Sequence, residues 1–339
     1  MKNKVQLKDI ALAAGVSPAL ASYVMNGRYE NRIKKETADK IRKIAEEMGY
    51  VPNQIAKSLK IKKTFTIGLM LGDIMNPFSY HIARIIEDEA KKYNYTVIFG
   101  SCDENKDQSK KLMDTLINRQ VDGFIIAAAA GTQSQLKSLQ QMEIPFILID
   151  RYFPEEKFNY ITIDNYGASF QAVDHLAKTG REKIAIINYE SELVHLQNRT
   201  KGYVDALKAN KIKPKQEWVC NVKMRDNPEN IKNEIAEFLK NRKSIDALFV
   251  STNGLTLQTL KLLNKLEIKV PDDLAIVCFD ETDAVELFYS PLTFVKQPMQ
   301  QMGSLAVQTL LKQVEKNDNQ LHEIVLETTF VVNKSSGVA

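Results

Sequence analysis

Apolar residues recur at helical spacing twice near the N-terminus, and a glycine separates the two patterns. The first pattern consists of Leu7, Ile10, Ala11 and Ala14. Gly15 interrupts it. Ser17 is a favourable N-cap and Pro18 suits the first helical position, where a missing N–H costs nothing, so a second helix should begin here. These residues predict two short helices joined by a glycine turn.

The second helix would have one buried face and one outward face. The buried face would hold Ala21, Val24 and Met25, and the outward face Ala19, Ser22, Tyr23 and Asn26. A helix of this size can enter a DNA major groove, as in the helix-turn-helix motif. An ordinary helical hairpin without a nucleic-acid partner fits the same residues, and the pattern alone does not separate the two.

Two further patterns complete this region. A third helix is predicted from about Lys35 to Met48, and Gly49 ends it. Asn53 to Lys60 forms a short amphipathic segment. Because so few residues cannot hold a helix in water unaided, this segment should order only against a partner.

From Thr66 onward the pattern changes to short apolar runs that alternate with helical stretches. The runs read TIGLML, TVIFGS, DGFIIAAA, FILID, KIAIIN, ALFVS and LAIVCF. The helical stretches are Tyr80 to Tyr93, Asp107 to Asn118, Ser134 to Met142, Asn165 to Lys178, Arg199 to Ala209 and Asn230 to Leu239. Buried strands alternating with helices predict two successive α/β lobes, each a doubly wound parallel sheet. Ligands bind beyond the carboxyl ends of such strands, so the cleft between the lobes is the predicted pocket.

Charge is distributed unevenly along the 339 residues. Residues 1–63 contain 14 Lys and Arg against 6 Asp and Glu, a net charge of +8, whereas the remainder contains 32 against 36. A basic N-terminal region followed by a slightly acidic remainder is the pattern expected of a protein that contacts nucleic-acid phosphates through its N-terminal region alone. A solvated lysine-rich surface would explain the charge but not its coincidence with the helix-turn-helix pattern.

Composition narrows the functional classes. Cys102, Cys220 and Cys278 are odd in number and outside metal-ligand spacing, which favours reduced packing residues. The N-terminus lacks a signal-peptide core, and the apolar runs are too short to span a bilayer. We therefore expect a cytoplasmic protein with no membrane partner.

The residues also match a known family over nearly the whole chain. The matching stretches include KDIALAAGVS, SYVMNG, ETADKIRKIAEEMGYVPNQIAKSLK, TIGLMLGDIMNPF, PFILIDR, RTKGYVDAL, VPDDLAIVCFDET and SPLTFVKQP. Together they resemble the lactose-repressor/galactose-repressor (LacI/GalR) family of bacterial transcription regulators. The resemblance implies an all-α helix-turn-helix headpiece, a hinge helix and an α/β core like that of periplasmic sugar-binding proteins. It also implies a homodimer that binds near-palindromic operator DNA and responds to a small molecule.

The resemblance implies specific domain boundaries. The headpiece would span residues 1–50, the hinge helix and linker 51–63, and the effector-binding core 64–339. Both lobes would be discontinuous, with crossings near Ile163, Val295 and Leu321. The N-lobe would hold about 64–162 and 295–320, and the C-lobe about 163–294 and 321–339.

The DNA-binding residues follow from the same resemblance. Base contacts fall on Pro18, Ala19 and Tyr23, with Ser17, Ser22 and Asn26 nearer phosphates or the helix ends. Leu20 could contact DNA or belong to the core, and core is favoured. Pro18 and Ala19 offer no hydrogen bonds, so Tyr23 alone can donate and accept towards bases. In the hinge, Leu59 would insert as a minor-groove wedge, with Asn53, Ser58 and Lys60 beside it on the groove and backbone.

The resemblance places an effector site in the interlobe cleft. Its expected lining is Asp73, Phe78, Asp150, Arg151, Arg199, Asn253 and Asp280. Carboxylates, a carboxamide and arginines suit the hydroxyls of a sugar or sugar phosphate, with Phe78 as an apolar wall. Plain alternatives remain open: Asp73 as a helix cap, and Arg199 paired with an acidic neighbour. Asp164 and Asn165 are expected to start a helix and not to touch ligand.

The expected function is therefore an allosteric repressor of carbohydrate-utilisation genes with no cofactor or metal. Whether the effector releases DNA or strengthens its binding is not encoded in these motifs. A solute-binding protein shares the core fold, but the headpiece argues against it. An enzyme is disfavoured because the chain has no dinucleotide-binding loop, phosphate-binding loop, nucleophile elbow or metal-spaced cluster.

Overall fold

The computed structural model describes residues 5–27, 33–50, 63–224, 227–241, 244–282, 284–316 and 320–337. The chain divides into two compact units, Met1–Thr64 and Phe65–Ala339. The predicted all-α headpiece and two-lobed α/β core are confirmed, each within its own unit. All three cysteines are free and buried.

The first unit contains three helices, α1 (Leu7–Ala14), α2 (Pro18–Met25) and α3 (Lys35–Glu47). Gly15 ends α1 with φ of 69°, a left-handed conformation that glycine adopts without strain. The Ser17 side chain accepts a hydrogen bond from the Leu20 N–H at 3.2 Å and so caps α2 as predicted. Ile10 and Ile41 are fully buried in the small core that joins the helices.

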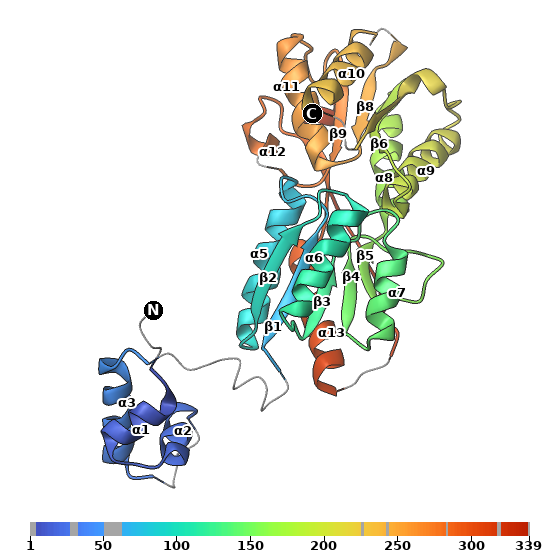
Figure 1. The fold of residues 1–339 in the computed structure, drawn as a ribbon. Helices are drawn as coiled ribbons and strands as arrows, with labels where there is room; N and C mark the ends of the chain where they lie inside the picture. The colour runs from blue at the N-terminus through green and yellow to red at the C-terminus, as the bar shows by residue number, and fades with distance from the viewer. Residues whose placement is uncertain are drawn as a thin grey trace. The chain divides into compact units, whose positions relative to one another are not determined.

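The second unit consists of two lobes, each built on a six-stranded sheet (Figure 1). The first sheet has the order β11-β5-β4-β3-β1-β2, with all neighbouring strands parallel. Its strands are β1 (Thr66–Leu71), β2 (Thr96–Ser101), β3 (Gly123–Ile126), β4 (Phe146–Ile149), β5 (Tyr160–Ile163) and β11 (Glu323–Leu326). Its helices are α5 (Pro77–Lys92), α6 (Lys106–Asn118), α7 (Gln133–Gln141) and α13 (Met299–Lys316).

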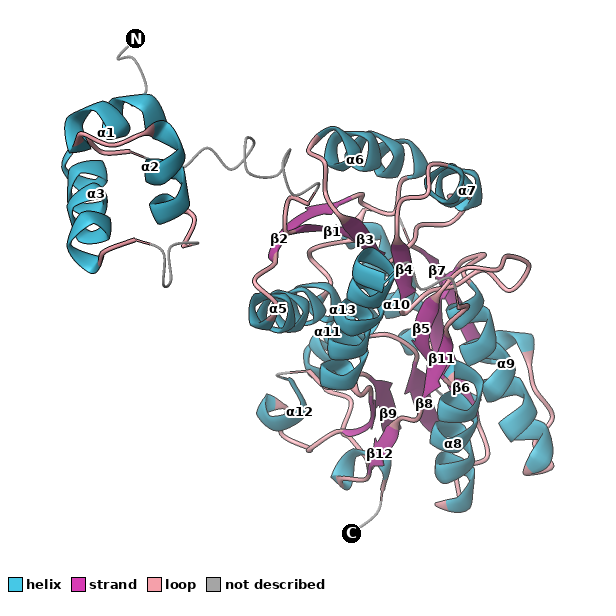
Figure 2. Ribbon diagram, turned by 90° about the horizontal axis from the view of Figure 1, so that it is seen from below, coloured by secondary structure: helices cyan, strands magenta, loops and turns pink. Residues whose placement is uncertain are grey.

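Helices cover both faces of the first sheet (Figure 2). Alternate residues of one strand enter different cores: Ile67 packs on the side of α5 and α13, and Met70 on the side of α6 and α7. Strands buried on both faces explain why the apolar runs in the sequence are nearly continuous.

The second sheet has the order β12-β10-β9-β8-β6-β7, parallel except for the antiparallel pair of β10 and β12. Its strands are β6 (Ile184–Glu190), β7 (Val219–Lys223), β8 (Ala247–Val250), β9 (Ala275–Phe279), β10 (Thr293–Lys296) and β12 (Thr329–Val331). Its helices are α8 (Asn165–Lys178), α9 (Val194–Ala209), α10 (Pro228–Lys240), α11 (Asn253–Lys265) and α12 (Ala284–Leu287). Short 3₁₀ turns lie at Gln216–Trp218 and Lys334–Ser336.

Strand pairing places the two later lobe crossings. β10 pairs with β9 and ends at Lys296, so the chain returns to the first lobe directly after this strand, close to the expected crossing near Val295. β11 pairs in parallel with β5 of the first sheet, so the last crossing follows Leu326 and not Leu321. This shift arises because β11 completes the edge of the first sheet before the chain leaves that lobe.

Candidate functional site

The outward face of α2 is open for contact. Ser17, Pro18, Ala19 and Asn26 are exposed, Ser22 is half-buried, and the Tyr23 side chain is 49% exposed. Leu20 is also half-buried.

Two residues of this face bond to each other. The Asn26 Nδ2 donates to the Ser22 carbonyl at 2.7 Å and to the Ser22 Oγ at 3.2 Å. This fixes the C-terminal end of α2. The phenol of Tyr23 remains the exposed group with both donor and acceptor capacity on the predicted base-reading positions.

The hinge predictions cannot be placed. Asn53, Ser58, Leu59 and Lys60 lie outside the described residues, as do residues 51–62 of the predicted hinge. They remain predictions from the family resemblance.

The loop after β1 carries the first predicted effector residues. Asp73 accepts from the Met75 N–H at 2.9 Å and shapes the turn, whereas Asn76 caps α5 by accepting from the Phe78 N–H at 3.1 Å. The alternative that Asp73 caps the helix is therefore wrong. Phe78 is buried.

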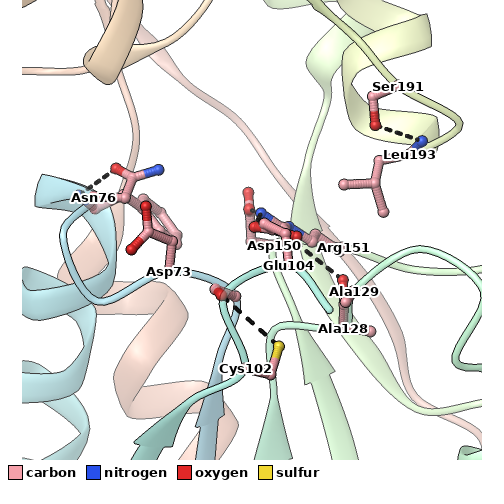
Figure 3. A network of polar contacts seen from close by, with 12 residues as sticks. Asp73, Asn76, Cys102, Glu104, Ala128, Ala129, Asp150, Arg151, Ser191 and Leu193 are labelled. Atoms are coloured by element: carbon pink, nitrogen blue, oxygen red, sulfur yellow. Dashed lines mark hydrogen bonds and ion pairs between the residues drawn. The ribbon is translucent and has the colours of Figure 1, made fainter. Parts of the chain in front are cut away.

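The ends of β2 and β4 bring three charged side chains together (Figure 3). Arg151 donates from Nη2 and Nη1 to the two carboxylate oxygens of Glu104 at 2.6 and 2.7 Å, and from Nη1 to the Ala128 carbonyl at 3.1 Å. Its Nε lies 3.8 Å from Asp150 Oδ2. All three charged side chains are buried, so the pair of Arg151 and Glu104 is shielded from water.

Arg199 projects from α9 of the second lobe and is 3% exposed. Its Nε donates to Asn165 Oδ1 at 2.8 Å and its Nη1 to the Ser251 carbonyl at 2.7 Å, while its guanidinium carbon lies 3.6 Å from the centre of the Phe279 ring. No hydrogen bond joins it to a carboxylate among the described residues, so the acidic-neighbour alternative is not what orients it.

Asp280 follows β9 as Asp150 follows β4, and both adopt left-handed backbones, with φ of 75° and 67°. Asp280 accepts a hydrogen bond from Gln297 Nε2 and another from the Asn253 backbone N–H at the start of α11. Both aspartates sit at carboxyl ends of parallel strands, one in each lobe. Strained backbone at two such positions is typical of ligand sites.

Charges act across the cleft between the lobes. Burial raises the pKa of Asp150, opposed by Arg151 and by Arg199 of the other lobe, and Asp280 raises it further. Burial raises the pKa of Asp280 in the same way, opposed mainly by Arg199. Burial lowers the pKa of His195 well below its usual value, with Arg151 and Arg199 adding to the effect, so His195 is neutral. Asp150 and Arg151 of the first lobe therefore influence the charges of Arg199 and Asp280 of the second.

A cavity of about 580 Å³ adjoins this cluster, lined by α5, by Asp280 and by the crossing after β10. Its volume is within the range of small-molecule sites. Of the seven predicted effector residues, only Asp280 lines it.

Sequence reasoning missed Glu104, Ser251 and Gln297, and assigned Asn165 only a helix-starting role. Glu104 follows β2 without a recognisable motif. Ser251 acts through its backbone carbonyl, which no side-chain pattern reports. No group of three or more His, Cys, Asp or Glu that could hold a metal ion occurs among the described residues.

Replacing Asp164 with alanine should lower the free energy of unfolding by about 1 kcal/mol, because its carboxylate caps α8 by accepting from the Gly167 N–H at 2.8 Å. Ligand-induced stabilisation should be unchanged. Urea unfolding with and without ligand measures both, and loss of the ligand response would show that Asp164 belongs to the site.

Asp150→Asn should raise the melting temperature of the ligand-free protein, because burial makes the charged carboxylate unfavourable. A carboxylate whose pKa is higher in the folded state destabilises the fold increasingly as pH rises from its unfolded pKa, about 3.9, through its folded value. The variant should therefore lose less stability than the parent as pH rises. Thermal unfolding across this pH range tests it, and a lower melting temperature at neutral pH would contradict it.

Comparison with known proteins gives two domain matches. Residues 6–53 match the model described as bacterial regulatory proteins, lacI family, and residues 173–336 match the periplasmic binding protein-like domain. Catabolite control protein A of Priestia megaterium is 30% identical over 313 residues, which cover 92% of this chain and 93% of that protein.

Two solved structures agree with the fold. The lac repressor dimer bound to operator and the anti-inducer ONPF has a TM-score of 0.86 at 21% identity, covering 98% of this chain and 99% of that chain. A LacI family transcriptional regulator from Enterococcus faecium with bound ribose has a TM-score of 0.70 at 26% identity, covering 80% and 98%. No helix in the described ranges is long and apolar enough to cross a bilayer.

Proposed function

The chain belongs to the LacI family of bacterial regulatory proteins, and from this we propose that it is a DNA-binding repressor of carbohydrate-utilisation genes. A small sugar or sugar phosphate held between the two lobes sets its operator affinity. The observation that carries the proposal is the placement of buried Asp150 and buried Asp280 at the carboxyl ends of parallel strands, one in each lobe, with the buried Arg199 guanidinium against the Phe279 ring next to Asp280. A ligand bound among these groups contacts both lobes at once and can therefore change their spacing.

We propose that the chain acts as a homodimer on a near-palindromic operator. The lac repressor in its solved complex is a dimer on operator, and the Enterococcus faecium regulator holds ribose. Two headpieces related by two-fold symmetry read two half-sites through α2. Tyr23 is the proposed base-reading side chain, with Pro18 and Ala19 in apolar contact and Ser17, Ser22 and Asn26 near the backbone.

The hinge links DNA binding to the core in this proposal. Leu59 serves as the minor-groove wedge, flanked by Asn53, Ser58 and Lys60. Because two hinges must meet on one operator, the distance between the two cores controls affinity. A protein that binds chromosomal operators acts in the cytoplasm.

The rival functions have less support. An extracytoplasmic solute-binding protein would share the core, but residues 6–53 match a regulatory headpiece. For an enzyme, the relative from Priestia megaterium offers no support, because its name is that of a catabolite control protein.

Gel-shift titration against the promoter region of the protein's own gene tests the proposal. Binding should weaken steeply with salt, since each phosphate contact contributes roughly 0.9 to the slope of log K against log salt. Binding that is indifferent to salt and to sequence, or catalytic turnover without DNA binding, would reject the regulator.

A further inference from the structure

The effector cleft contains buried acceptor atoms that no described residue satisfies. They include Asp150 Oδ1 and Gln297 Oε1, in side chains that are 7% and 6% exposed. Gln297 turns its amide nitrogen towards Asp280, so its oxygen is the free atom. Unsatisfied buried acceptors are costly, and a ligand with hydroxyl donors would satisfy them.

Arg151, the cation beside Asp150, is already neutralised. Glu104 accepts two hydrogen bonds from Arg151, and the Ala128 carbonyl accepts a third. Arg151 Nε makes no hydrogen bond to a described residue, but it lies 3.8 Å from Asp150 Oδ2 and so faces a second carboxylate. A guanidinium held bidentately by one carboxylate cannot offer the same fork to a phosphate.

The surrounding backbone preserves this pair. A Cβ on Gly72 would overlap Glu104 Oε1 and lie 2.9 Å from Arg151 Nη1. Glycine therefore allows the pair to lie directly against the loop that presents Asp73.

The other cations of the cleft and of the adjoining cavity also have hydrogen-bond or ion-pair partners. Arg199 has two of its nitrogens committed to Asn165 and Ser251. In the adjoining cavity, Arg84 Nε pairs with Asp88 at 2.9 Å and Lys296 pairs with Glu281 at 2.8 Å.

Carboxylates outnumber guanidinium groups at the cleft. Three buried carboxylates, Glu104, Asp150 and Asp280, stand against two buried guanidinium groups, Arg151 and Arg199, a formal excess of one negative charge. Because these five side chains are buried, the excess repels a further anion more strongly than it would in bulk water.

We propose that the cleft selects an uncharged, hydroxyl-rich sugar and rejects its phosphorylated or carboxylated counterparts, because Glu104 occupies the arginine that would bind the anion. This inference rests on the proposed sugar effector and narrows its class. Glu104 acts as a specificity-determining residue through Arg151.

Thermal-shift and calorimetric titrations of the full chain with matched pairs of ligands test the inference. The pairs are ribose with ribose 5-phosphate, glucose with glucose 6-phosphate, and galactose with galacturonate. For any pair that binds, the neutral member should bind at least about tenfold more tightly. A tighter anionic member would overturn the inference while leaving the sugar effector intact. If no sugar of either kind binds, the sugar effector of the proposed function fails, and this inference fails with it.

The variant Glu104→Gln tests whether the Glu104 carboxylate causes the preference for neutral sugars. Without the Glu104 carboxylate, Arg151 is free to bind the anionic member of a pair. The ratio of the dissociation constant of the anionic ligand to that of the neutral ligand should therefore fall by roughly tenfold. Glu217→Gln, which removes an exposed carboxylate 3.8 Å from Lys215, is the matched control and should leave the preference unchanged. An unaltered preference in Glu104→Gln would overturn the role of Glu104, and the comparison in the parent protein stands even if the variant is unstable.

Discussion

Replacing Arg199 with alanine should abolish the response to effector. The guanidinium donates to Asn165 and to the Ser251 carbonyl and lies against the Phe279 ring, so the change removes the buried cation that α9 contributes to the proposed site. The parent should gain about 2.7 kcal/mol of stability at a ligand concentration one hundred times its dissociation constant, and the variant should gain nothing measurable. Two buried acceptors lose their donors, so the ligand-free variant should also be less stable by roughly 2–4 kcal/mol.

Two matched variants separate binding from folding in this experiment. Arg199→Lys keeps the charge but loses the fixed fork, and it should fold while binding ligand at least tenfold more weakly, by a rough estimate. Lys201→Ala lies two residues along α9, is exposed, and should respond as the parent does. A full ligand response in Arg199→Ala would mean that the effector binds elsewhere.

Replacing Tyr23 with alanine should cost about 1–3 kcal/mol per headpiece in operator binding, roughly 5- to 150-fold in affinity for each half-site. Tyr23 is half-exposed on α2, and the neighbouring Pro18 and Ala19 have no hydrogen-bonding side chains. The loss should fall on the specific operator and leave binding to unrelated DNA nearly unchanged, because non-specific binding depends on phosphate contacts.

Fluorescence anisotropy with operator and scrambled duplexes at fixed salt measures the two affinities. Tyr23→Phe, which keeps the ring, should recover the part of the affinity that comes from apolar contact. Leu12→Ala is a control on α1, where the side chain is 85% exposed. Equal loss on both duplexes for Tyr23→Ala would show that the residue does not read bases.

Local signals explain why the helix-turn-helix and the parallel strands of the core could be predicted. Ser17 and Pro18 start α2, Gly15 ends α1, and continuous apolar runs mark strands buried on both faces. Where the local signal was absent, boundaries were wrong. The helix that the sequence predicts from Arg199 begins five residues earlier, at Val194. The sequence gives no sign of this start, because the N-cap residue, Leu193, has no side chain that can cap a helix.

Tertiary packing explains what the sequence could not show about the site. Asp73 and Asn76 are equally plausible caps by residue type, and only the backbone path assigns the role to Asn76. Glu104 becomes part of the site because β2 and β4 are parallel strands of one sheet and their carboxyl ends lie at the same end of it. This places Glu104 against Arg151. A pairing between residues 47 positions apart has no periodic signature in the chain.

The most direct test of the account is the operator dissociation constant of the full-length dimer, measured with and without a saturating sugar identified by calorimetry. If occupancy of the cleft controls the hinge, the constant should change about 5- to 150-fold, a coupling of roughly 1–3 kcal/mol, and Arg199→Ala should show no change at the same sugar concentration. An operator affinity that stays constant while calorimetry shows the sugar bound would contradict the coupling between cleft and headpiece.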